Sequence, residues 1–536
     1  MKTLTNQTLI LIAASAVAIP LSAQAAKRSK QPNILFIMTD DHTSQAIGAY
    51  NTHLSKLNPT PTIDALVQEG VLFENVFCNN SISTPSRATI MTGQYSHTNG
   101  VLTLDDHLDT EQQHLAVEMK KLGYQTAVIG KWHLGCEPTA FDFYSVFTQY
   151  AGQGAYFDPL TADSRNKDKK YPNNTIKHKG HSSDIITDMT MEWIGERDKS
   201  KPFFVLHHFK APHGYFEYHT RYADYLKDVD IPVPATLLNR EGFGSVGSRG
   251  EDNSLERFIG TSISKRNVHH NYVKEFKIDL GDDDKNTLAA YDKYMKDYLR
   301  CVKGVDDNME RLFQYLKDEG LWDNTIIVYT SDQGMMLGEH DLQDKRWMYD
   351  ESLRMPYIMR VPGAKVKNQR NDMMIQNVDF APTLLALAGA EKTRGYMQGE
   401  DFSSVFLGQE IEGWRDAIYY RYWMHMIHHN VPAQLGIRTK DYKLIFLYGR
   451  HYDPSRYGEK TFAWIKTSTA LIVPTPVSFE LYDLRKDPHE TTNVADDPKY
   501  SEVLKRLKRE LLALKLKVGD SDTANPEIQK IINDNF

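Results

Sequence analysis

The segment Ile34-Leu-Phe-Ile-Met38, followed by Thr39-Asp40-Asp41, decides the fold of this chain. Its apolar residues form an unbroken run, which is typical of a strand buried on both faces of a parallel sheet. Similar runs occur at residues 126–129, 203–206 and 325–329. Helical patterns lie between the runs, and the longest covers residues 291–317. Strands that alternate with helices predict an α/β fold whose large, mostly parallel sheet is sandwiched by helices.

The sequence pattern changes towards the C-terminus, where it predicts shorter strands in place of the buried apolar runs. Residues 415–447 and 478–484 favour antiparallel strands, and residues 499–516 favour a terminal helix. A length of 536 residues allows two to four domains at about 150 residues each. We predict a catalytic domain over residues 26–390. A smaller α+β subdomain with an antiparallel sheet, residues 391–536, is expected to complete the substrate pocket.

The N-terminus has the pattern of a secretory signal peptide over residues 1–25. Lys2 supplies the positive charge, Leu9–Leu21 is an apolar stretch, and Ala23-Gln24-Ala25 resembles a cleavage site. The apolar stretch is too short to span a bilayer comfortably, although an uncleaved anchor is the alternative. The sequence therefore predicts a periplasmic or secreted protein without a stable membrane anchor.

Charge and cysteine content exclude two broad classes of protein. The chain has 63 basic and 70 acidic residues, giving a formal net charge of −7, so no nucleic-acid partner is expected. Three cysteines are too few for a disulfide scaffold. The stability of the protein must therefore come from its apolar core.

Acidic residues follow two of the predicted strands. Asp40 and Asp41 follow the first strand, and Asp332 and Gln333 follow the last. Carboxyl ends of parallel strands meet at one edge of a sheet, where carboxylates repel one another unless a cation joins them. Oxygen ligands favour Ca²⁺ or Mg²⁺ over zinc. The alternative is that Asp40 and Asp332 are helix N-caps.

Basic residues follow the other two predicted strands. Lys131 and His133 follow one strand, and His213 follows the other. Histidine can transfer protons near neutral pH, and lysine can bind an anion. A structural role is the alternative for each histidine.

The segment from Ser83 to Gly93, STPSRATIMTG, carries the strongest signal. Pro85 fits the first turn of a helix, which would place Ser83 at an N-terminus whose free N–H groups favour an anion. Arg87 could reach back to that anion with two parallel hydrogen bonds. The alternative is an ordinary N-cap serine followed by a surface helix.

This segment resembles the signature of the formylglycine-dependent sulfatases, a family of the alkaline phosphatase superfamily. Further matches follow in the family's order: Asn33–Asp41, Gly130–Gly135, Ala211–His213, Ser331–Gly334, Asn377–Thr383, Gly436–Thr439, Leu481–Leu484 and Asp487-Pro488. The resemblance implies an alkaline-phosphatase-like sheet and the hydrolysis of sulfate esters. It also implies that a sulfatase-maturating enzyme oxidises Ser83 to Cα-formylglycine.

The resemblance also implies roles for individual residues. The Ca²⁺ ligands would be Asp40, Asp41, Ser83, Asp332 and Gln333. A hydroxyl of the hydrated aldehyde at Ser83 would attack sulfur, with Arg87, Lys131 and Lys345 stabilising the developing charge. His213 would protonate the leaving alcohol, and His133 would take the proton from the second hydroxyl to release sulfate.

A sulfated carbohydrate is the substrate class that the resemblance favours, with exo action and N-acetylglucosamine 6-sulfate or a marine or host polysaccharide as candidates. Cationic and ring-bearing side chains suit such a substrate, and the candidates for binding it are His340, Arg346, His425, His428, His429 and Arg438. Burial in a core strand is the alternative for the segment 419–429. The rival functions are a phosphatase or phosphonate monoester hydrolase, and a non-catalytic glycan-binding homologue if Ser83 stays unmodified.

Overall fold

The structure is a computed structural model that describes residues 31–238, 242–250, 261–262, 280–391, 395–453, 455 and 474–536. The predicted signal peptide, residues 1–25, lies outside the described residues. Among the helices that are described, none combines the length and apolar character that a membrane span requires.

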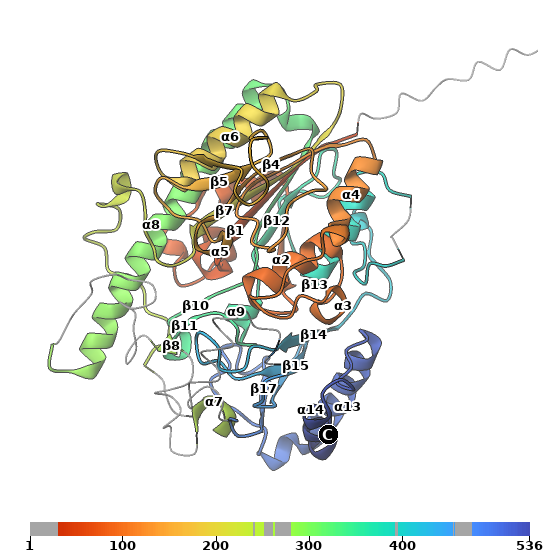
Figure 1. The fold of residues 1–536 in the computed structure, drawn as a ribbon. Coiled ribbons are helices and arrows are strands. Elements are labelled where there is room, and N and C mark those ends of the chain that lie inside the picture. The colour runs from red at the N-terminus through yellow and green to blue at the C-terminus, as the bar shows by residue number, and fades with distance from the viewer. Residues whose placement is uncertain are drawn as a thin grey trace, which may run out of the picture.

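A ten-stranded mixed sheet forms the centre of the fold (Figure 1). Its order is β13 (Gln369–Gln376), β2 (Val71–Phe77), β12 (Tyr357–Arg360), β9 (Thr325–Ser331), β1 (Asn33–Asp40), β7 (Phe203–Pro212), β3 (Gln125–Gly130), β4 (Phe143–Phe147), β5 (Leu160–Asp163) and β6 (Thr175–Lys177). The four strands expected from the sequence, β9, β1, β7 and β3, are consecutive neighbours and pair in parallel. Strands β12, β5 and β6 pair antiparallel with their neighbours. The predicted, mostly parallel sheet is confirmed.

Helices cover both faces of this sheet, which explains the unbroken apolar run of β1. Phe36 of β1 belongs to the core beneath α2 (Ser83–Thr92), α4 (His114–Lys121) and α10 (Phe380–Leu387). Ile37 belongs to the core beneath α1 (Pro61–Leu66), α6 (Ser182–Glu196) and α8 (Asp283–Asp318). Successive side chains of a strand point to opposite faces, so a strand between two helical layers needs apolar residues at every position.

Short elements join these layers. The short helices are α3 (Ser96–Asn99), α5 (Gln149–Gly152), α7 (Val246–Arg249) and α9 (Asp350–Leu353). A small sheet has the order β10 (Met336–Leu337), β11 (Leu342–Asp344) and β8 (Thr261–Ser262).

The predicted antiparallel sheet near the C-terminus is also confirmed. It has the order β14 (Ala417–Tyr422), β15 (Gln434–Thr439), β16 (Tyr442–Leu447) and β17 (Ser478–Asp483), and α13 (Ser501–Lys517) packs against it. A second helix, α14 (Pro526–Asn535), was not predicted. Ile418 and Tyr420 of β14 share an apolar core with Phe36 of the large sheet. The domain boundary near residue 390 stays a prediction, because one core spans both sheets.

Candidate active site

The four central parallel strands bring their polar C-terminal residues to one edge of the sheet. Asp40 ends β1 and Asp332 follows β9, while Lys131 and His213 follow β3 and β7. A Cβ on Gly130, which has φ 103°, would lie 1.9 Å from the carbonyl oxygen of His208. Only glycine therefore permits the close approach of strands β3 and β7 just before Lys131.

Ser83 faces this edge from the start of α2. Ile82 occupies the N-cap position, and Ser83 is the first residue of the helix, so the reading of Ser83 as an N-cap is wrong. The buried Ser83 hydroxyl donates a hydrogen bond to Asp40 Oδ1 at 3.3 Å. The N-terminus of α2 therefore meets the acidic ends of the strands.

Arg87, one turn further along α2, holds the group together. Its Nε donates to Asp332 Oδ2 at 3.0 Å, and its Nη1 donates to the carbonyl of Lys131 at 2.7 Å. Its buried Nη2 has no hydrogen-bond partner among the described residues. Nη2 lies 3.9 Å from Asp40 Oδ1, which is beyond hydrogen-bond distance, so it can donate to an anion while the other donors fix the side chain.

Two lysines neutralise two of the buried carboxylates. Lys131 Nζ bonds to Asp40, and Lys345 Nζ lies 2.6 and 2.7 Å from the two carboxylate oxygens of Asp41. Burial by itself raises the pKa of Asp40, but the nearby groups Lys131, His213, Arg87 and Lys345 together outweigh burial and hold that pKa well below the usual value. Burial, reinforced by Asp40, raises the pKa of Asp332 to about 7.

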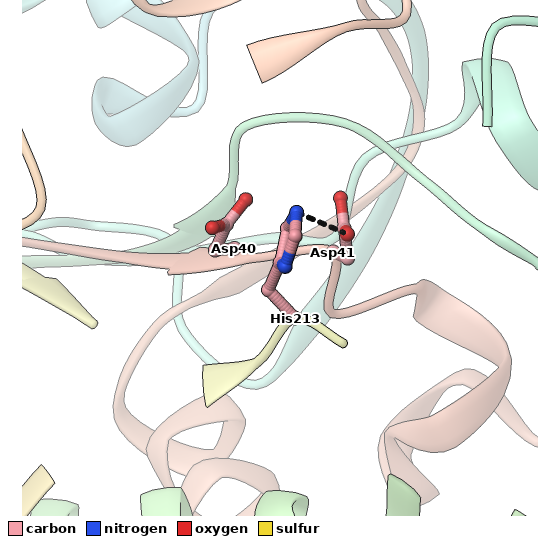
Figure 2. A group of neighbouring side chains, drawn as sticks. All are labelled: Asp40, Asp41 and His213. Carbon is pink, nitrogen blue, oxygen red and sulfur yellow. Dashed lines mark ion pairs between the residues drawn. The ribbon is translucent and has the colours of Figure 1, made fainter. Parts of the chain in front are cut away.

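The acidic cluster has the donor set of a hard-cation site. Figure 2 shows the imidazole of His213 between Asp40 and Asp41, and one possible ligand atom from each of these three residues lies within 4.8 Å of the others. His213 Nε2 is 3.7 Å from Asp41 Oδ2. The buried Oε1 of Gln333 has no hydrogen-bond partner in the described part of the chain, and its amide nitrogen bonds to Asp41. Clustered carboxylates with an orphaned amide oxygen fit Ca²⁺ or Mg²⁺.

The alternative that Asp40 and Asp332 are helix N-caps is wrong. In the described part of the chain, Asp40 is the last residue of β1, and the next helical turn after it has Thr43 as its N-cap. Asp332 leads from β9 towards β10 without starting a helix. Both carboxylates therefore remain at the sheet edge.

Both predicted histidines are held as neutral imidazoles. Burial and the charge of Lys131 lower the pKa of His133 well below its usual value, and burial does the same for His213. The hydroxyl of Tyr156 donates to the backbone carbonyl of His213 at 2.7 Å. Tyr156 is a positioning residue that sequence reasoning missed, because a buried tyrosine before β5 has no motif of its own.

A cavity of about 280 Å³ opens beside Ser83. It is lined by the predicted residues Ser83, His213, Lys345, Arg346, His428 and His429, together with Leu104, Gln153, Gly214 and Asp344, which were not predicted. Asp344 could have been found from its place beside Lys345. Asp344 and Arg346 form an ion pair, and both have left-handed backbone angles, φ 77° and 84°. Such strain is typical of functional sites.

Three predicted substrate-binding residues do not line this cavity as far as the structure describes it. Each of them contacts another part of the protein instead. The ring of His340 stacks on Phe243 at 3.9 Å between centroids. His425 Nδ1 accepts a hydrogen bond from the backbone of Ala433 at 3.1 Å. Arg438 pairs with Asp350 at 3.1 Å. Their cationic and ring chemistry looked suitable, but the fold uses it in packing.

Known proteins resemble this chain over most of its length. The chain matches the Sulfatase family over residues 32–390 and the family described as N-sulphoglucosamine sulphohydrolase, C-terminal, over residues 338–458. An N-acetylglucosamine-6-O-sulfatase from Bacteroides thetaiotaomicron is 34% identical over 97% of this chain and 93% of its own length. A human N-acetylglucosamine-6-sulfatase is 22% identical over 74% of this chain and 68% of its own.

Solved structures share the fold. A structure in complex with its substrate D-glucosamine-2-N,6-O-disulfate has a TM-score of 0.79 and 34% identity, and covers 92% of this chain and 100% of the other. A phosphonate monoester hydrolase of Agrobacterium radiobacter, at 23% identity and TM-score 0.67, covers 92% of this chain and 97% of its own, and shows the fold alone. The chain therefore belongs to the sulfatase family and is a sulfuric ester hydrolase.

Proposed function

We propose that this enzyme removes sulfate from a sulfated carbohydrate by exo action, with the 6-sulfate of N-acetylglucosamine as the first candidate. The observation that carries the proposal is the cavity at Ser83, whose lining brings Lys345 and His213 together with Arg346, His428 and His429. These cationic and ring nitrogen groups suit an anionic ester and sugar hydroxyl groups. The B. thetaiotaomicron relative carries this activity in its name.

Two groups would complete the site. Asp40, Asp41, Asp332 and Gln333 would hold Ca²⁺ next to Ser83, where the cation would neutralise negative charge on the sulfuryl oxygens. Oxidation of Ser83 to Cα-formylglycine by a sulfatase-maturating enzyme would supply a hydrated aldehyde as the nucleophile.

We infer a periplasmic or secreted enzyme, in keeping with the signal-peptide pattern of residues 1–25.

The chain's own residues would bind and orient the ester. Arg87 would donate from its Nη2 to a sulfuryl oxygen, and Lys131 and Lys345, paired with Asp40 and Asp41, would add positive charge. His213, which lines the cavity, would together with Lys345 help to expel the leaving alcohol. His133, held neutral by burial, would act as the base that leads to sulfate release.

The test is a desulfation screen over defined sulfated mono- and disaccharides, using protein matured in its native host. Peptide mass spectrometry across Ser83 on the same sample should show the mass loss of formylglycine formation. An unmodified serine with no turnover would support the non-catalytic alternative. Faster hydrolysis of an aryl phosphate than of the matching aryl sulfate would support the phosphatase or phosphonate monoester alternative.

Calcium titration is expected to stabilise the protein. Bound Ca²⁺ would relieve the repulsion among Asp40, Asp41 and Asp332, so saturating Ca²⁺ should stabilise the fold by about 3 kcal/mol at a concentration 100 times the Kd. The thermal unfolding midpoint, measured with Ca²⁺ and with a chelator, reports this shift. Asp40→Asn should reduce the shift, whereas Asp534→Asn, on the exposed face of α14, should retain it. An equal shift in both variants would contradict the site.

Two of the three histidines in the segment 419–429, His425 and His428, should respond differently to substitution. His428 is exposed at the cavity, so His428→Ala should raise KM about three- to tenfold with little change in stability. His425 is fully buried and bonds to Ala433, so His425→Ala should lower the free energy of unfolding by about 1–3 kcal/mol. Steady-state kinetics and urea unfolding of both variants check this contrast, and identical behaviour would refute it.

A further inference from the structure

A sugar-binding surface outside the cavity is suggested by one exposed aromatic residue. Tyr150, in the short helix α5, is 75% exposed and is the most exposed aromatic side chain among the described residues. The exposure of Tyr150 does not by itself indicate a function, but the turn that contains Tyr150 leads to a residue that lines the active-site cavity.

The turn that carries Tyr150 is rigidly connected to the catalytic residues. The N–H of Gln153 donates to the Tyr150 carbonyl at 3.2 Å, and the side chain of Gln153 lines the cavity and bonds to Lys131. A Cβ on Gly152 would lie 3.7 Å from the Cα of His133. The end of the turn at Gln153 is thus part of the cavity lining, while Tyr150, three residues earlier, is exposed and does not belong to that lining.

The backbone of this turn is held in a costly conformation. Tyr150 and the next residue, Ala151, both have left-handed angles, φ 51° and 56°. Neither residue favours this region, so the surrounding structure must impose it. The N–H of Gly154 bonds to the Gln149 carbonyl at 2.9 Å, and the Gln149 side chain accepts from Leu160 at 2.6 Å. The fold therefore fixes the turn from both ends.

The size of the cavity leaves the next sugar outside it. A volume of about 280 Å³ lies at the lower end for ligand cavities, so the cavity holds one small ligand. A second residue of a glycan must then lie at the rim. A pyranose presents C–H groups on its faces and hydroxyls at its edges, which suits packing on an exposed tyrosine ring.

We propose that Tyr150 is a stacking platform for the sugar linked to the sulfated residue, so that the enzyme prefers a chain end to a free monosaccharide. This inference rests on the proposed function. It assigns the part of the substrate beyond the sulfated ring to the rim formed by α5. In this proposal the loop contributes Gln153 inside the cavity and Tyr150 at the mouth of the cavity.

The first test compares two substrates: N-acetylglucosamine 6-sulfate, and a β-linked disaccharide that carries this residue at its non-reducing end. The ratio of kcat/KM for the disaccharide to that for the monosaccharide should fall about three- to tenfold in Tyr150→Ala. Tyr150→Phe, which keeps the ring, should retain the ratio. Tyr396→Ala is the matched control, because Tyr396 is 41% exposed and bonds to Glu118 away from the cavity. An unchanged ratio in Tyr150→Ala overturns the platform.

The second test does not depend on turnover. In a Ser83→Ala background, calorimetric titration with the same disaccharide should give a Kd about three- to tenfold weaker when Tyr150→Ala is added. If the wild-type enzyme hydrolysed neither substrate, the proposed function would be wrong. The binding comparison would still test whether Tyr150 contacts the disaccharide. Equal affinities, or no binding of the disaccharide, would overturn the assignment to Tyr150.

Discussion

Replacing Ser83 by alanine is expected to lower the rate of sulfate ester hydrolysis by at least about a thousandfold. The reason is that alanine removes the oxygen that becomes the nucleophile, while the surrounding charges remain. Ser83 lies at the start of α2 with its hydroxyl 3.3 Å from Asp40, between the acid cluster and the cavity. Sulfate release from the best substrate of the desulfation screen measures the loss.

The fold of the Ser83→Ala variant should survive, because the change removes one hydrogen bond worth about 1 kcal/mol. Ser96→Ala is the matched control. Its hydroxyl is also buried, in α3 and outside the lining of the cavity, and makes no hydrogen bond to the described residues. Ser96→Ala should keep full activity. Comparable activity of both variants would remove Ser83 from the mechanism.

Replacing Arg421 by leucine is expected to lower the free energy of unfolding by about 3–5 kcal/mol. Arg421 is fully buried, and its Nη1 and Nη2 lie 2.7 Å from Asp520 and Asp522. These pairs tie β14 of the small sheet to the segment after α13. Burial raises the pKa of Asp520, but Arg421, Lys515, His97 and the hydrogen bond from Tyr419 together outweigh burial and lower that pKa to about 2. Removing the guanidinium would leave two buried carboxylates with Lys515 as the remaining salt-bridge partner among the described residues.

Urea unfolding of Arg421→Leu, followed by circular dichroism, gives the change directly. Arg506→Leu is the control, because Arg506 is 49% exposed in its side chain and its contact with Glu510 is 3.9 Å long. That exposed pair should contribute less than about 1 kcal/mol. If the two variants lost equal stability, the buried network would not be holding the C-terminal unit in place.

The candidate active site could be predicted because each of its residues follows a recognisable local pattern. Asp40, Lys131 and Asp332 lie within three residues of an unbroken apolar run, and His213 follows the end of β7, which begins with such a run. Parallel strands bring such positions to one sheet edge. Ser83 begins a segment whose helical start is marked by Pro85. The structure places these residues together as expected.

The substrate-binding residues could not be sorted in this way. His425 and His428 are three residues apart in one polar and aromatic segment, yet His425 is buried against Ala433 while His428 reaches the cavity. Residue type cannot separate them, because the turns between β14 and β15 decide which side chain points inwards. Tyr156 and Gln153 had no motif at all, and only the packing of their loops brings them to His213 and Lys131.

The sequence by itself determined the layered α/β architecture and the identity of the residues at the central strand ends. Periodicity and strand-end position are local properties, and the buried run at Ile34–Met38 expresses both. The tertiary structure alone decided the shape of the cavity, the partners of Arg438 and His340, and the outward position of Tyr150. Those features depend on contacts between segments far apart in the chain, and no local pattern encodes such contacts.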